Sequence, residues 1–151
     1  MDWPGDIFSI VLAIVLGAAI GVEREFSGKP AGLRTNILIC LGAAIFTIIS
    51  KQMAGENEAL TRIAAQIVTG VGFLGAGAII QDRGGVHGLT TAATIWFMAC
   101  LGMACGAGLY KLAVISTLLA IFILIGLRLI NRSLSRYMEK NKPRDVSDEP
   151  D

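Results

Sequence analysis

Five long stretches of this chain carry no charged side chain. The sequence has 13 Lys and Arg and 12 Asp and Glu, and all of them lie outside the ranges Ile7–Val22, Thr35–Ser50, Ile63–Gln81, Gly88–Tyr110 and Leu112–Leu127. A helix on a soluble protein keeps a polar face for water, so these segments must face apolar surroundings on all sides. A bilayer core takes about 17–25 helical residues to cross. The sequence therefore predicts an all-α, polytopic membrane protein of about five transmembrane helices.

The positions of Lys and Arg predict how these helices are oriented. If the chain crosses the membrane five times, ten of the 13 basic residues fall on the side of the C-terminus. Cytoplasmic loops carry an excess of Lys and Arg, so we expect the N-terminus outside and the C-terminus in the cytoplasm. We expect one transmembrane domain over residues 1–130. Residues 131–151 should form a basic and then acidic cytoplasmic tail that is largely disordered.

Glycines are concentrated in three of the five predicted helices. In lipid, helix association depends on close backbone packing, which small residues permit. We therefore expect the first, third and fourth helices to form the packed centre, through Gly17, Gly21, Gly70, Gly72, Gly75, Gly77, Gly102 and Gly106. A single bundle of five short helices leaves little room for an internal pathway. We therefore also expect a homo-oligomer, most simply a dimer.

Polar residues gather where four predicted segments meet one membrane boundary. They end the first and third segments and begin the second and fourth: Glu23, Arg24, Glu25, Arg34, Thr35, Asn36, Asp82, Thr90 and Thr91. Carboxylate oxygens are ligands that Mg²⁺ accepts, so Glu23, Glu25 and Asp82 form a candidate metal set, with Arg24 and Arg34 as ion-pair partners. The simpler interpretation is that charged residues mark helix ends because they must stay in water.

Other chemistry has little support in the sequence. The single histidine, His87, lies in a glycine-flanked loop, and no serine or cysteine pairs with it at a recognisable spacing. Gly70–Gly75 spells GxGxxG, but no strand precedes it and no acidic residue follows at the required distance, so packing is the better interpretation. We expect no enzyme activity, no nucleic-acid partner and no cofactor, except Mg²⁺ as a ligand or transported ion.

At these residues the chain resembles the MgtC/SapB family of bacterial inner-membrane proteins. The matching segments are GAAIGVERE (Gly17–Glu25), AGLRTNILICLGAA (Ala31–Ala44), RIAAQIVTGVGFLGAGAII (Arg62–Ile80) and GLTTAATIWFMACLGMACGAGLY (Gly88–Tyr110). They cover most of the region between Gly17 and Tyr110 in the order that the family has. Longer members carry a soluble cytoplasmic domain after the membrane region, so this chain resembles the short form.

The resemblance implies a multi-pass protein of the bacterial inner membrane that is linked to growth at low magnesium and, in pathogens, to virulence. Three functions remain open. One is a small transporter for Mg²⁺ or another solute. The alternative is a regulator that transports nothing and binds another membrane protein, such as ATP synthase. The third is a membrane-embedded structural or lipid-associated protein. Besides the lipid bilayer, the implied partners are therefore a second copy of the chain and a different membrane protein.

Overall fold

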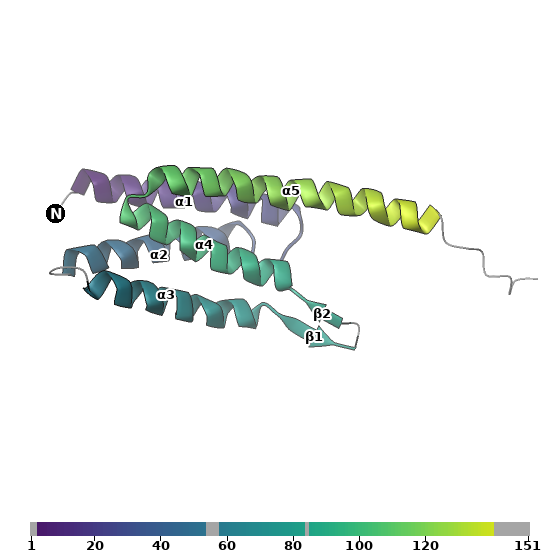
Figure 1. Cartoon of the computed structure of the whole chain (residues 1–151), viewed down its shortest axis with the longest axis horizontal. Helices are drawn as coiled ribbons and strands as arrows, with labels where there is room; N and C mark the ends of the chain where they lie inside the picture. The colour runs from purple at the N-terminus through teal and green to yellow at the C-terminus, as the bar shows by residue number, and fades with distance from the viewer. Residues whose placement is uncertain (1–2, 54–57, 84, 141–151) are drawn as a thin grey trace, which may run out of the picture.

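The computed structural model is a bundle of helices with one short hairpin at one end (Figure 1). It describes residues 3–53, 58–83 and 85–140, of which residues 58–61 and 129–140 are described by their backbone alone. The elements are α1 (Trp3–Phe26), α2 (Leu33–Met53), α3 (Glu58–Gly77), β1 (Ile80–Asp82), β2 (Gly85–His87), α4 (Leu89–Ala107) and α5 (Tyr110–Lys140). Successive helices run in opposite directions. We call the end of the bundle that carries β1 and β2 the hairpin end.

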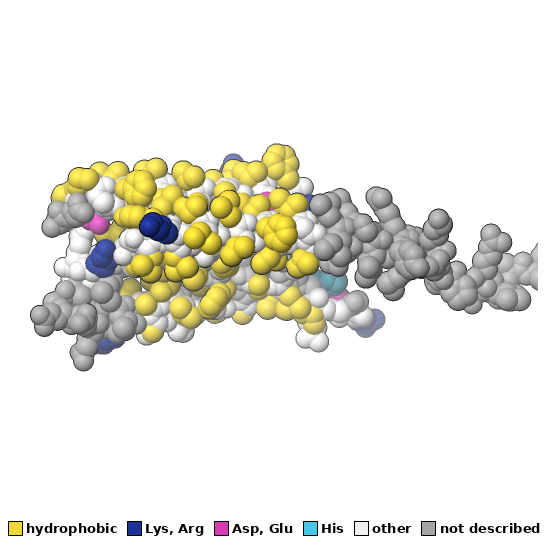
Figure 2. All heavy atoms as spheres, turned by 45° about the horizontal axis from the view of Figure 1, so that its top comes forward, with side chains coloured by type: hydrophobic (Ala, Val, Ile, Leu, Met, Phe, Trp, Pro, Cys, Tyr) yellow, Lys and Arg dark blue, Asp and Glu magenta, His cyan; other side chains and the backbone are white. Residues whose placement is uncertain are grey.

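Four of these helices are long and apolar enough to cross a bilayer. They are α1, α2, α4 and the part of α5 from Tyr110 to Arg128. Figure 2 shows hydrophobic side chains over most of the visible face of the bundle, and large ones such as Phe8, Leu38 and Phe122 are more than half exposed. An apolar surface of this extent needs a nonpolar environment. The predicted all-α, multi-pass membrane protein is confirmed at this level, whereas its orientation stays a prediction.

The third apolar segment differs from the prediction of one continuous helix. The helix ends at Gly77, and Ile80–Asp82 instead pairs with Gly85–His87 as an antiparallel hairpin. Gly88 then starts α4 with a positive φ of 86°, and a Cβ at this residue would collide with the carbonyl oxygen of Ala78. The predicted window Ile63–Gln81 is therefore a helix followed by a strand. Among the described residues, α3 is not one of the helices that qualify as a span.

Two helices end in the same local motif. After α1, Gly28 has a φ of 62°, its N–H bonds to the Glu25 carbonyl and the Lys29 N–H bonds to the Arg24 carbonyl. After α4, Gly108 has a φ of 83°, and the N–H groups of Gly108 and Leu109 repeat the pattern. This is the Schellman arrangement, which satisfies the last carbonyls of a helix and reverses the chain sharply. It lets α1 lead into α2 and α4 into α5 through short connections.

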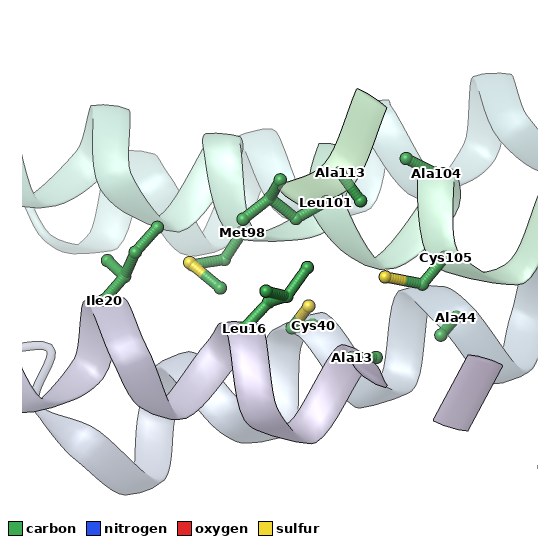
Figure 3. Packing of buried hydrophobic residues seen from close by; sticks show 10 residues of the cluster. All are labelled: Ala13, Leu16, Ile20, Cys40, Ala44, Met98, Leu101, Ala104, Cys105 and Ala113. Atoms are coloured by element: carbon green, nitrogen blue, oxygen red, sulfur yellow. The ribbon is translucent and has the colours of Figure 1, made fainter. Parts of the chain in front are cut away.

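The packed centre is formed by α1, α2 and α4. Figure 3 shows ten buried residues from α1, α2, α4 and the start of α5 that pack together: Ala13, Leu16, Ile20, Cys40, Ala44, Met98, Leu101, Ala104, Cys105 and Ala113. Glycines set how closely these helices approach. A Cβ added to Gly102 would lie 2.1 Å from the carbonyl oxygen of Cys40, and one added to Gly106 would lie 2.5 Å from that of Ala44.

The structure corrects the expected place of α3 in this centre. A Cβ added to Gly70, Gly72 or Gly77 would meet nothing within 4 Å, and Gly75 makes only ordinary contact with Ala92 of α4. The helix packs against α4 and α2 from the outside. The glycines of α1 and α4 instead lie against α2. Those of α4 meet small residues there, such as Ala43 and Ala44, whereas Gly21 of α1 meets Leu33 and Asn36.

The last helix extends past the predicted end of the transmembrane domain. It runs to Lys140, so the backbone of 131–140 is helical where a largely disordered tail was expected. The rest of that tail, residues 141–151, lies outside the described residues. Near its start, α5 is held to α1 by Tyr110, whose hydroxyl lies 2.9 Å from the Ser9 hydroxyl and whose ring meets Phe8 edge-on.

Candidate functional site

The hairpin end brings together the four polar segments that the sequence singles out. The end of α1, the start of α2, the hairpin and the start of α4 all lie at this end (Figure 1). Within this group, side chains differ greatly in burial. Arg24, Asn36 and Thr91 are buried, whereas Glu25, Arg34, Thr35, Asp82 and Thr90 are exposed. The candidate site is therefore a smaller set than the sequence suggested.

Arg24 is the central residue of this site. It is 2% exposed, and its Nη2 donates a hydrogen bond of 3.1 Å to the Thr91 hydroxyl on α4. Its Nη1 lies 4.0 Å from Oε2 of Glu23. Its Nε has no hydrogen-bond partner among the described residues. Burying a charge is costly unless it is paired, so this partly satisfied guanidinium between two helices is unusual and a candidate for function.

The close approach of α1 and α2 places Asn36 on the same side of α1 as Arg24. Gly17, Gly21 and Arg24 recur at i, i+4 and i+7, so they share one face of the helix. A Cβ added to Gly21 would lie 2.9 Å from the Cα of Leu33 and 3.3 Å from the Cβ of Asn36. The glycines thus bring the first turn of α2 against α1, one turn before Arg24.

Asn36 is fully buried and ties down the loop that leads into α2. Its Nδ2 donates to the carbonyl oxygens of Ala31 at 2.7 Å and Gly32 at 2.8 Å. Its Oδ1 has no hydrogen-bond partner within the described part of the chain. A buried polar atom without a partner costs about 1–3 kcal/mol. Asn36 and Arg24 therefore both retain unused hydrogen-bonding capacity at this end of the bundle.

Glu23 connects α1 to α5 through a serine. Its side chain is 10% exposed, and its Oε1 accepts a hydrogen bond of 2.6 Å from the Ser27 hydroxyl. Arg128 of α5 donates from Nη1 to the same hydroxyl oxygen. The predicted ion-pair partner Arg34 is exposed instead, and Arg24 at 4.0 Å is the closer cation. Glu23 thus lies between two arginines, one buried and one half-buried.

The candidate metal set is not brought together. Glu25 is exposed and its Oε2 accepts the Leu33 N–H at 2.9 Å, where it caps the start of α2. Asp82 lies on the hairpin with its Oδ1 3.4 Å from Nε2 of His87, both side chains being more than half exposed. In the ranges that the structure describes, no three His, Cys, Asp or Glu side chains gather as metal ligands would.

Sequence reasoning missed both Ser27 and Arg128 as members of the site. Ser27 follows Glu23 by four residues, and this spacing on a helix is a signal that could have found it. Arg128 is 101 residues from Ser27 along the chain. No local pattern in the sequence predicts such a contact, because the contact forms only when α5 packs alongside α1 in the folded bundle.

Comparison with known proteins places this bundle in a family. The sequence profile of the MgtC family matches residues 10–133. Protein MgtC of Brucella abortus is 50% identical over 109 residues, which are 72% of this chain and 45% of that protein. The Escherichia coli K12 protein named "Putative magnesium transporter YhiD" is 42% identical over 142 residues, which are 89% of this chain and 65% of that protein.

A third relative matches this chain over almost its full length. Protein SrpB of Synechococcus elongatus is 38% identical over 172 residues, covering 99% of this chain and 94% of SrpB. By contrast, the chain spans about half the length of the Brucella protein. No solved structure matches this chain. The family profile reaches from α1 into α5, and the chain belongs to the MgtC family.

Proposed function

We propose that this chain acts in magnesium homeostasis as a membrane regulator that contacts other membrane proteins and does not pass Mg²⁺ through its own bundle. The observation that carries the proposal is the buried guanidinium of Arg24 between α1 and α4. A fixed positive charge repels a divalent cation. At about 5 Å and an effective dielectric constant of about 20, that repulsion is roughly 7 kcal/mol before the Glu23 carboxylate offsets part of it.

The packing below Arg24 supports the same proposal. Ile20, Cys40 and Met98 lie in the middle of α1, α2 and α4 and are fully buried against each other's helices (Figure 3). Protein interiors at this density leave few voids as large as a water molecule. A hydrated cation that followed the axis of the bundle would have to displace these side chains. The lipid-facing surfaces of α3 and α5 are the natural contact surfaces for a partner, for which the family resemblance suggests ATP synthase.

Transport is the second candidate. The name of YhiD associates that relative with magnesium transport. A pathway of this kind would have to form between copies of the chain. The glycine face of α3, where Gly70, Gly72 and Gly77 have open space in the single chain, would suit close contact with a second copy. A homodimer in the bacterial inner membrane, with its N-terminus outside, therefore remains part of the proposal.

Growth at low Mg²⁺ tests the proposed role. A bacterial strain that lacks its own family member would carry this chain with Glu23→Gln, Arg24→Gln or the control Arg34→Gln. We expect the first two variants to lose growth support at matched abundance in the membrane, because each removes a charge from the buried site. The control should retain growth, because Arg34 is exposed at the same end. Equal growth of Arg24→Gln and Arg34→Gln would mean that these charges only mark helix ends.

A further inference from the structure

A crevice of about 460 Å³ lies between α1 and α5 at the hairpin end. Its wall has two parts of different chemistry. One part is apolar, formed by Ala19, Val22, Phe26, Ile121 and Ile125. The other part is polar and consists of Glu23, Ser27 and Arg128. The crevice is therefore amphipathic, and its polar part lies near the end of the apolar span of α5, which reaches Arg128.

The polar part contains one negative and one positive side chain, and the protein uses only some of their hydrogen-bonding groups. Glu23 accepts one hydrogen bond at Oε1, from Ser27, while its Oε2 is buried and lies 4.0 Å from Nη1 of Arg24. A carboxylate can accept about four. Arg128 donates to the Ser27 hydroxyl from one of its five N–H groups. Ser27 holds the two charged groups on either side of its hydroxyl. A ligand with one anionic and one cationic group would complement both.

We propose that this crevice binds a phospholipid whose headgroup carries a phosphate and a primary ammonium, as phosphatidylethanolamine does. The planar guanidinium of Arg128 suits a phosphate, which it can bind through two parallel N–H groups. The ammonium has three donors for the Glu23 carboxylate. An acyl chain would lie along Val22 and Ile125, continuous with the surrounding lipid. An anionic headgroup without an ammonium would bring its charge toward Glu23 without the attraction that an ammonium adds.

Native mass spectrometry of the detergent-solubilised full chain tests this with three added lipids. Phosphatidylethanolamine should be retained about three- to tenfold better than phosphatidylglycerol, which lacks the ammonium, and phosphatidylcholine, whose ammonium has no N–H donor. This three- to tenfold difference in retention corresponds to the free energy of one charge-assisted hydrogen bond at a partly exposed site. Equal retention of the three lipids, or a preference for phosphatidylglycerol, would overturn the proposal.

Variants assign the preference to this crevice. Arg128→Gln should lower retention of phosphatidylethanolamine, and Arg128→Lys should restore part of it because the positive charge returns. Glu23→Gln should abolish the preference over phosphatidylglycerol. The matched control Arg34→Gln, at the same end but outside the crevice, should behave as the unmodified chain. If Arg34→Gln lowers retention as much as Arg128→Gln does, the lipid binds by general charge and the crevice has no part in it.

A soluble competitor identifies which part of the molecule is recognised. Glycerophosphoethanolamine has the same charged groups without acyl chains, so it should displace little lipid at equal concentration. Full displacement would mean that a free headgroup, and no membrane lipid, is the occupant. These measurements read out binding in vitro and are independent of growth at low Mg²⁺. A protein that fails the growth test can still pass this one, and the reverse also holds.

Discussion

Replacing Gly102 with alanine should destabilise the bundle, because α4 has no room there for a methyl group. The added Cβ would lie 2.1 Å from the Cys40 carbonyl oxygen, 2.8 Å from the Ala43 Cβ and 2.9 Å from the Cys40 carbonyl carbon. Two of these atoms belong to the backbone of α2, which cannot move aside as a flexible side chain can. To restore ordinary contact of about 3.5 Å between the added Cβ and the Cys40 carbonyl oxygen, α2 and α4 would have to separate by about 1.4 Å along the contact line. Overpacking of this kind costs about 1–3 kcal/mol.

Unfolding of the purified protein by SDS, followed by tryptophan fluorescence, measures this cost. The control is Gly72→Ala on α3, where an added Cβ meets nothing within 4 Å. Alanine favours a helix over glycine by about 1 kcal/mol, so the control should unfold at the same SDS fraction as the unmodified chain or at a slightly higher one. The reasoning is refuted if Gly102→Ala unfolds no earlier than Gly72→Ala.

Three further predictions test other parts of the structure. Thr91→Val should lower the free energy of unfolding by about 1.5–3 kcal/mol, because it removes the only hydroxyl that the buried Arg24 is seen to bond among the described residues, while Thr91→Ser should retain most of it. A cysteine in place of Ser147 should react with a membrane-impermeant maleimide only in inside-out vesicles, and reaction in intact cells would reverse the predicted orientation. The detergent-solubilised protein should have the mass of a dimer by light scattering, and a strictly monomeric mass that added lipid does not change would refute the homodimer.

The charge-free windows predicted most of the fold because each was long and contained no competing signal. They did not reveal β1, since a run such as Ile79-Ile80-Gln81 is compatible with a buried helix and with a strand. In the structure the glycines of α1 and α4 lie close to α2, but glycines in a sequence show only that a close approach is possible. The choice of α2 as partner depends on which small residues face them in three dimensions, as Cys40 and Ala44 do.

The sequence indicated which residues of the candidate site lie at the same membrane boundary, but not which of them contact each other. Helix ends reveal which polar residues share a membrane boundary, so Glu23, Arg24, Asn36 and Thr91 could be grouped from the sequence. Their burial could not be predicted, because it depends on the depth of each side chain between neighbouring helices. For the same reason, Arg34 seemed an equally good partner for Glu23, although the structure leaves it exposed.

A magnesium flux measurement in liposomes shows whether this chain passes Mg²⁺. The purified chain would be reconstituted into liposomes that contain a fluorescent Mg²⁺ indicator, and an inward Mg²⁺ gradient would then be applied. Because a buried guanidinium and close-packed side chains lie along the bundle, we expect Mg²⁺ to enter no faster than it enters liposomes without protein. Saturable, protein-dependent Mg²⁺ entry that Glu23→Gln abolishes would contradict it and establish transport instead.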